Sequence, residues 1–163
     1  MTEELQKIMD ESIKLELNVA DLYMIFSRAF PGDSPFWIKL ALEEEHHASL
    51  IRGARDAWLS GRKFPHELLA PKVDMLLEAN SKLASLLEKY RKNPPSREIA
   101  FNVAFNVEES AGEVHFQRAM EQLPTSPIVE VFQILNHDDK DHARRIRAYM
   151  SDKGIELRSH LMK

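Results

Sequence analysis

Several residue types and sequence features are missing from this 163-residue chain. It has no cysteine, which excludes disulfides, a thiolate nucleophile and any zinc or iron–sulfur site built on cysteine ligands. Metal chemistry in this chain would therefore have to use carboxylates and imidazoles. No apolar run approaches the roughly 18 residues that a membrane-spanning helix requires, so we expect no membrane partner.

Basic residues are also fewer than acidic ones. The chain has 22 Lys and Arg against 26 Asp and Glu, a net charge of -4. It has no basic stripe, so we expect no nucleic-acid partner. The first residues, MTEELQKIMDE, lack the apolar segment of a signal peptide. We therefore expect a cytoplasmic protein.

Only 5 glycines and 8 prolines interrupt the chain, while 44% of its residues are hydrophobic. The interruptions separate four long segments with helical periodicity, at about residues 3–30, 35–60, 96–123 and 126–152. Short loops join these segments into two antiparallel hairpins, at about 3–60 and 96–152. The connection at about 61–95 carries a helical pattern of its own. The sequence thus predicts a single all-α domain over residues 1–163, a four-helix bundle with one long crossover that contains an additional helix.

The two predicted hairpins share one pattern: an acid, an aromatic residue seven positions later, and an acid-x-x-His-Ala motif on the next helix. A single acid-x-x-His motif is common on solvated helix faces, but two in matching register are more specific. The pattern consists of Glu16, Tyr23 and Glu44-x-x-His47-Ala48 in the first hairpin, and of Glu109, Phe116 and Asp139-x-x-His142-Ala143 in the second.

Helical periodicity, about 100° per residue, predicts that the four acids face the core. Around Glu16, the neighbours on the same face are apolar, and the same holds for Glu44 and in large part for Asp139. The stripe around Glu109 is the most polar of the four. The neighbours of Glu16 are Met9, Ile13, Ala20 and Tyr23, and those of Glu109 include Asn102 and Asn106. On the helix of Glu44, we expect three residues at the solvent or at the edge of the stripe: Glu43, Glu45 and His46.

Four buried carboxylates need positive charge nearby, because desolvation and mutual repulsion both oppose their ionisation. Two divalent cations would supply that charge, and the two histidines would each add a neutral nitrogen ligand. The sequence therefore predicts a dinuclear metal site, with a degenerate or empty bundle as the alternative. The predicted ligands are Glu16, Glu44, His47, Glu109, Asp139 and His142.

These motifs resemble the rubrerythrin-like branch of the ferritin-like di-iron carboxylate proteins, over about residues 10–150. The resemblance implies a ferritin-like bundle, two iron ions and a homodimer, although manganese or zinc also suits such ligands. It implies a non-haem di-iron oxidoreductase that reduces hydrogen peroxide or dioxygen as a small-molecule substrate. The alternatives are ferrous iron oxidation with iron storage, and a metal-binding scaffold without redox turnover.

The chain also departs from that family. Its lack of cysteine excludes the usual rubredoxin-like domain, so the resemblance implies an external electron donor. Asp139 stands where the family usually has glutamate, and Gly112 stands in the place of an extra family glutamate, with Glu113 one residue further on. Glu113 is a candidate auxiliary ligand, or else pairs with a basic residue at the helix edge. Tyr23 is a candidate catalytic group that could hydrogen-bond a ligand carboxylate, or else a core aromatic.

Overall fold

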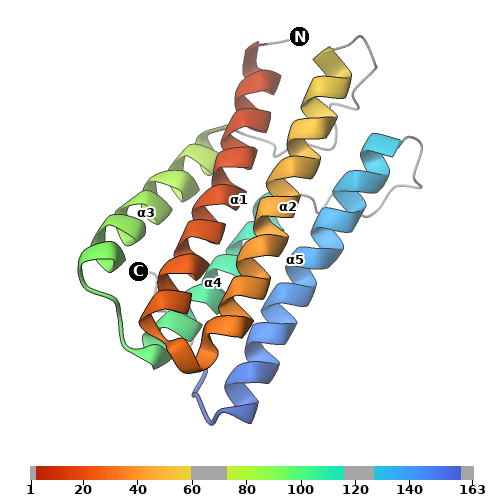
Figure 1. Cartoon of the computed structure of the whole chain (residues 1–163). Coiled ribbons are helices and arrows are strands. Elements are labelled where there is room, and N and C mark those ends of the chain that lie inside the picture. The colour runs from red at the N-terminus through yellow and green to blue at the C-terminus, as the bar shows by residue number, and fades with distance from the viewer. Residues whose placement is uncertain (1–2, 60–72, 116–126, 159–163) are drawn as a thin grey trace.

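A computed structural model describes residues 3–59, 73–115 and 127–158 of the chain, without the side chains of some helical residues, among them 111–115 and 131–140. The described residues are helical apart from short connections, and no strand occurs among them. The fold is a bundle of long helices (Figure 1). These are α1 (Glu3–Ala29), the short 3-10 helix η1 (Pro31–Asp33), α2 (Ser34–Leu59), α3 (Val73–Lys92), α4 (Arg97–His115) and α5 (Pro127–Asp152).

The four predicted helical segments are confirmed as α1, α2, α4 and α5, to within a few residues at the ends that the structure describes. The last part of the third segment, residues 116–123, lies outside the described residues. α1 and α2 run antiparallel, as do α4 and α5 (Figure 1). The helical pattern in the predicted connection corresponds to α3. After α5, Gly154 adopts a φ of 64°, a left-handed conformation that suits glycine and ends the helix.

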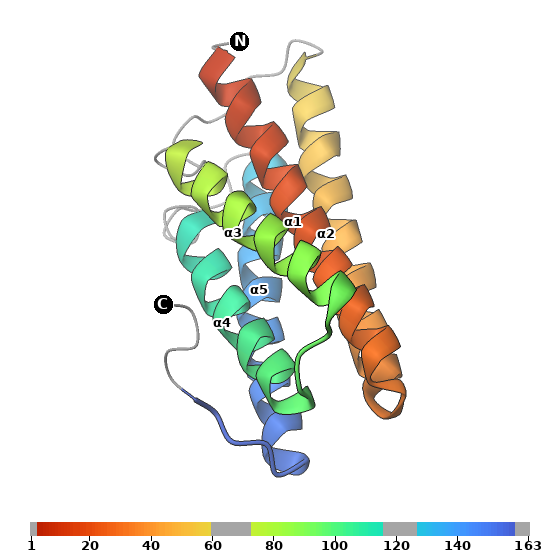
Figure 2. The ribbon, with the colours of Figure 1, turned by 90° about the vertical axis from the view of Figure 1, so that its left-hand side faces the viewer.

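α3 packs against α1 and crosses in front of it in Figure 2. Its buried positions recur at alternating intervals of four and three residues, which gives one apolar stripe. Asn80 lies within this stripe and is only 2% exposed. Its amide donates to Glu11 and accepts a 2.9 Å hydrogen bond from Asn18, so its polar atoms are satisfied. The buried residues of α3 are Leu76, Asn80, Leu83, Leu87 and Tyr90.

The turn between α1 and α2 is fastened to the other hairpin through Asp33. This carboxylate is 5% exposed and accepts two hydrogen bonds from Arg97 of α4, at 2.7 and 2.9 Å. It accepts a third from the Tyr149 hydroxyl of α5, at 2.9 Å. These charged hydrogen bonds hold the pKa of Asp33 below its usual value, although burial opposes the shift. The contact fixes how the two hairpins meet at one end of the bundle.

A cluster of aromatic rings fills the core next to this turn. Trp37 of α2 is fully buried and stacks on Tyr23 of α1 with the ring centroids 5.6 Å apart. It also contacts Phe26 and Phe101 at centroid distances of 5.2 and 4.4 Å. Burial of such large rings provides a substantial share of the hydrophobic stabilisation. The cluster closes one end of the interior, and the acidic residues lie beyond it along the same helices.

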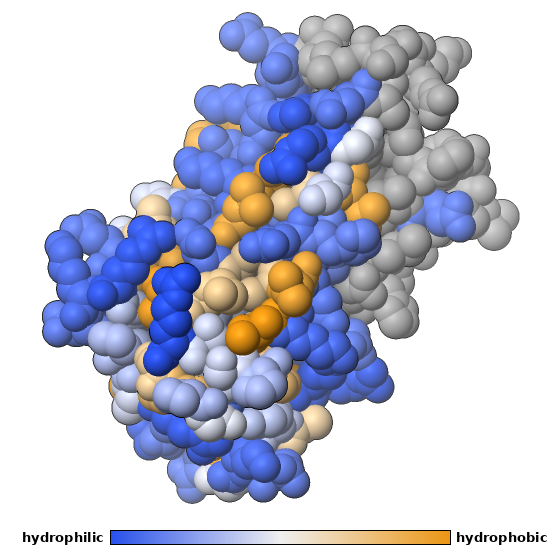
Figure 3. All heavy atoms as spheres, in the orientation of Figure 1, coloured by the Kyte–Doolittle hydropathy of each residue, from blue (hydrophilic) through white to orange (hydrophobic). Residues whose placement is uncertain are grey.

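The face of the molecule in Figure 3 is mainly hydrophilic, with a group of apolar residues near its centre. The exposed apolar residues of α2 include Ile38 and Leu42, at 39% and 59% exposure. Among the described residues, no helix is long and apolar enough to cross a membrane.

Candidate metal centre

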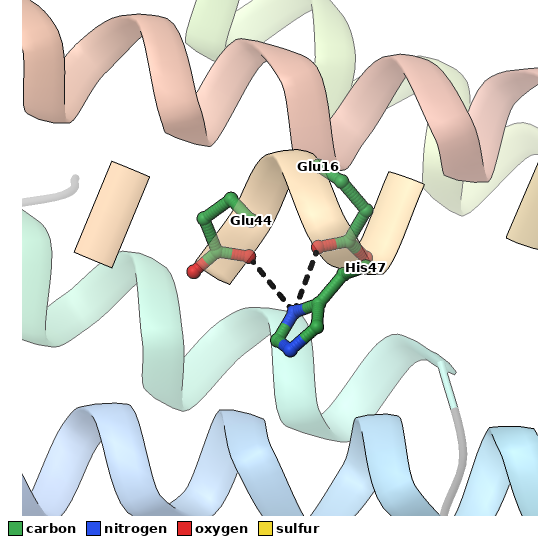
Figure 4. A group of neighbouring side chains, drawn as sticks. All are labelled: Glu16, Glu44 and His47. Carbon is green, nitrogen blue, oxygen red and sulfur yellow. Dashed lines mark hydrogen bonds and ion pairs between the residues drawn. The ribbon is translucent and has the colours of Figure 1, made fainter. Parts of the chain in front are cut away.

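The first group of polar side chains in the core joins α1 to α2. Glu16, Glu44 and His47 are 6%, 2% and 1% exposed. The Nδ1 atom of His47 lies 3.1 Å from Glu44 Oε2 and 3.7 Å from Glu16 Oε2 (Figure 4). One ligand atom from each of the three residues lies within 4.8 Å of the other two, a spacing that a metal ion can bridge. This confirms that the three residues meet in the core, as the sequence predicts.

Local sequence explains why these side chains turn inward. Glu44 and His47 are three residues apart on α2 and therefore share a face. Their neighbours on that face, Ala41, Ala48 and Ile51, are all at most 1% exposed. On α1, the predicted stripe is likewise buried, from Met9 and Ile13 to Ala20 and Tyr23. The small alanines beside the acids leave room for polar side chains between the helices.

A second group joins α2 to α4 and α5, and Glu44 belongs to it as well. It contains Glu44, Glu108 and His142, which are 2%, 3% and 1% exposed. His142 Nδ1 lies 2.8 Å from Glu44 Oε1 and 3.6 Å from Glu108 Oε2. Oε2 of Glu44 faces His47 while Oε1 faces His142. One carboxylate is therefore shared by two ligand groups, the arrangement that a bridging ligand requires.

The contact between Glu44 and His142 has an unusual character. Glu44 Oε1 and His142 Nδ1 are both buried, and neither has a hydrogen-bond partner in the described part of the chain. They lie 2.8 Å apart, but their directions do not make a hydrogen bond. Unsatisfied buried polar atoms are costly and uncommon. Both atoms are of the kind that bind metal, and one cation within reach of both would satisfy them.

The electrostatics of the core are consistent with this interpretation. Burial lowers the pKa of His47, but hydrogen bonding to Glu16 and Glu44 outweighs that effect and raises the pKa to about 11. Burial likewise opposes protonation of His142, while contacts with Glu108 and Glu44 raise its pKa to about 11. Without a cation, the carboxylates thus hold a proton on each imidazole. A metal ion would take the place of that proton, so binding releases protons.

Glu108, and not Glu109, is the α4 acid found in the buried groups, so the prediction that Glu109 faces the core was wrong. Glu109 is exposed, whereas Glu108 is 3% exposed and contacts His142. The two side chains differ in direction by about 100° around the helix. The residues three, four and seven positions before Glu108 are Phe105, Ala104 and Phe101, all buried and apolar. This apolar stripe indicates that Glu108 faces the core. It was overlooked because the comparison of the two hairpins paired Glu109 with Glu16.

Tyr23 contacts the centre directly. Its ring is fully buried, and its hydroxyl donates a hydrogen bond to Glu108 Oε1. Tyr23 therefore hydrogen-bonds a carboxylate of the second buried group, that of Glu108. The hydrogen bond satisfies the Glu108 oxygen that does not face His142, and so holds the carboxylate in place. A catalytic role for Tyr23 stays a prediction.

Two predicted site residues lie outside the described side chains. Asp139 falls in α5 and Glu113 in α4, where the structure gives the backbone alone. Asp139 stays a predicted ligand, and Glu113 stays a predicted auxiliary ligand.

One contact of the buried groups was missed in the sequence. Glu43 lies at the edge of the stripe, as expected, with its side chain 32% exposed, but its Oε2 also lies 3.1 Å from His142 Nε2. Arg145 Nη1 lies 2.7 Å from the same oxygen. A contact between two helices cannot be predicted from the periodicity of one of them. These residues line a pocket of ≈ 260 Å³ whose lining is Lys39, Glu43, Asp141, His142 and Arg145.

Comparison of the chain with protein-family models, with curated proteins and with solved structures gave no match. The class of protein is therefore defined by the residues themselves: an all-helical bundle whose buried glutamates and histidines could hold metal ions. The donor set of oxygens with one imidazole per group suits iron, manganese or zinc.

Proposed function

We propose that the chain binds two divalent cations side by side in the core of a ferritin-like bundle. Glu16, Glu44 and His47 would hold the first, and Glu44, Glu108 and His142 the second, with Glu44 as the shared ligand. The observation that carries this proposal is the position of the Glu44 carboxylate in both buried groups, with Oε2 3.1 Å from His47 Nδ1 and Oε1 2.8 Å from His142 Nδ1. Asp139 completes the ligand set in the proposal.

We further propose that the cations are iron and that the protein is a non-haem di-iron oxidoreductase. It would reduce hydrogen peroxide or dioxygen with electrons from an external donor, as the resemblance to rubrerythrins implies. For peroxide the balance is one H2O2, two electrons and two protons to two waters. Two ferrous ions, when bound, supply the two electrons.

The chain's own residues support such chemistry in three ways. The carboxylates of Glu16, Glu44 and Glu108 provide negative charge in a buried site, where it stabilises added positive charge more strongly than in water. The aromatic cluster and the alanines keep bulk water out. The Tyr23 hydroxyl keeps a proton next to Glu108, so a proton donor lies within reach of the centre.

The proposal is tested by anaerobic reconstitution of the metal-free protein with ferrous iron, followed by titration with hydrogen peroxide. We expect one peroxide to oxidise two irons per chain, with the appearance of ferric charge-transfer absorption. Addition of a one-electron reductant should then restore the ferrous form and permit further turnover. Continued uptake of iron well beyond two per chain would favour iron storage instead. Tight binding of two cations with no reaction toward peroxide or dioxygen would favour the scaffold function.

A further inference from the structure

Glu43 occupies a position between the buried centre and the surface. It precedes Glu44 on α2, yet its carboxylate turns toward α5, on the other hairpin. There it meets His142, whose side chain is 1% exposed. No role in binding a cation follows for Glu43, since it is absent from both groups of neighbouring ligand atoms found among the described residues.

The two nitrogens of His142 face different partners. Nδ1 faces Glu44 and Glu108, at 2.8 and 3.6 Å, and Nε2 faces Glu43, at 3.1 Å. An imidazole can bind a metal through Nδ1 only when that nitrogen carries no proton, and the neutral ring then carries its proton on Nε2. A carboxylate at Nε2 accepts that proton's hydrogen bond and so favours this tautomer over the other.

Arg145 fixes the carboxylate that faces His142. Its Nη1 lies 2.7 Å from Glu43 Oε2, the same oxygen that faces Nε2. Asp141, one turn earlier on α5, lies 3.5 Å from the same Arg145 nitrogen. Arg145 and Glu43 are partly buried, with side chains 23% and 32% exposed. Glu43 and Arg145 both line the pocket, and the contact between them restricts where the carboxylate can go.

We propose that Glu43, held by Arg145, is a positioning residue that fixes the tautomer and ring orientation of His142 toward the second cation. The inference rests on the proposed metal centre. It makes the two hairpins depend on one another, because an acid of α2 orients a ligand of α5. Loss of such outer contacts generally weakens metal binding by about 10–100-fold.

The proposal is tested with zinc, which binds without redox chemistry, in the full-length protein. Two-dimensional 15N–1H NMR correlations of the histidine rings report which nitrogen carries the proton and which binds metal. In the wild-type zinc form, we expect His142 to carry its proton on Nε2 and to bind through Nδ1. In Glu43→Ala, we expect a mixture of tautomers and an affinity for the second zinc ion about 10–100-fold weaker in competition with a chelator.

Two further variants keep the result interpretable. Glu43→Gln retains an oxygen that can accept from Nε2, so it should keep the wild-type tautomer and lose less affinity than the alanine variant. Glu45→Ala removes an exposed acid of the same helix and should behave like wild type. If Glu43→Ala binds two zinc ions as tightly as wild type with the same tautomer, the inference is overturned while the metal centre stands. If the wild-type protein binds fewer than two zinc ions per chain, both the proposed function and this inference are wrong.

Discussion

Glu44 and His142 come from different hairpins, yet Glu44 Oε1 and His142 Nδ1 lie 2.8 Å apart in the core. Neither atom has a hydrogen-bond partner in the part of the chain that the structure describes. The other oxygen of Glu44 accepts a hydrogen bond from His47 Nδ1 at 3.1 Å. One carboxylate therefore connects two histidines whose rings lie nearly parallel, with centroids 5.4 Å apart.

Substitution of Glu108 by Gln should remove one of the two cations, because the second ligand group loses its α4 carboxylate. The metal content after reconstitution and removal of free metal should fall from two to one per chain. Glu109→Gln is the matched control, since it makes the same chemical change one residue later at an exposed position. Equal metal content in the two variants would show that the inward residue of α4 has been misassigned.

Substitution of Glu44 by Gln should affect both cations, because this residue belongs to both ligand groups. We expect neither cation to be retained through gel filtration, whereas Glu108→Gln retains one. Inductively coupled plasma mass spectrometry of the eluted protein measures the difference. Retention of one cation by Glu44→Gln would mean that Glu44 is not the shared ligand.

Tyr23→Phe removes the hydrogen bond to Glu108 and keeps the ring that stacks on Trp37. Loss of a buried hydrogen bond to a charged group should cost about 1.5–3 kcal/mol of unfolding free energy, measured by urea denaturation of the metal-free protein. Two irons should still bind, but their reaction with peroxide should slow. Tyr90→Phe is the control for a buried tyrosine of α3 at the far side of Phe26. An unchanged peroxide rate in Tyr23→Phe would leave the residue a purely structural role.

Asp33 should make stability fall in acid. Its folded pKa is lowered from 3.8, chiefly by hydrogen bonding to Arg97. The ionised carboxylate therefore stabilises the fold above the unfolded pKa, and this contribution is lost as the pH falls from there through the folded pKa. Asp33→Asn should cost about 1–3 kcal/mol at pH 7, and the difference from wild type should shrink by pH 3. Urea denaturation of both metal-free proteins at the two pH values measures it; a difference independent of pH would contradict the assignment.

The sequence was sufficient for the four long helices of the two hairpins and for four of the five residues in the two buried groups. On α1 and α2, apolar neighbours surround Glu16 and Glu44 at the helical period, and both acids are buried as predicted. On α4, Asn102 and Asn106 made the stripe of Glu109 polar, which was a signal against that residue. Asn102 is fully buried for another reason: its side chain hydrogen-bonds the backbone of Glu98, Glu156 and Arg158.

The contact of Glu43 with His142 could not be predicted from the sequence either. Periodicity along α2 gives the direction of its side chain relative to Glu44, but not which helix packs on that side. Its contact with His142 depends on how α5 lies against α2, and that arrangement is a property of the assembled bundle. The sequence motif acid-acid-x-x-His at residues 43–47 would have suggested a role for Glu43 only with this packing known.

The proposed binding of two cations at the positions that Glu44 shares is tested by crystals of the anaerobically iron-reconstituted protein, measured at the iron absorption edge. We expect two anomalous peaks per chain, one between Glu16, Glu44 and His47 and the other between Glu44, Glu108 and His142. A single peak, no peak, or peaks away from Glu44 would contradict it.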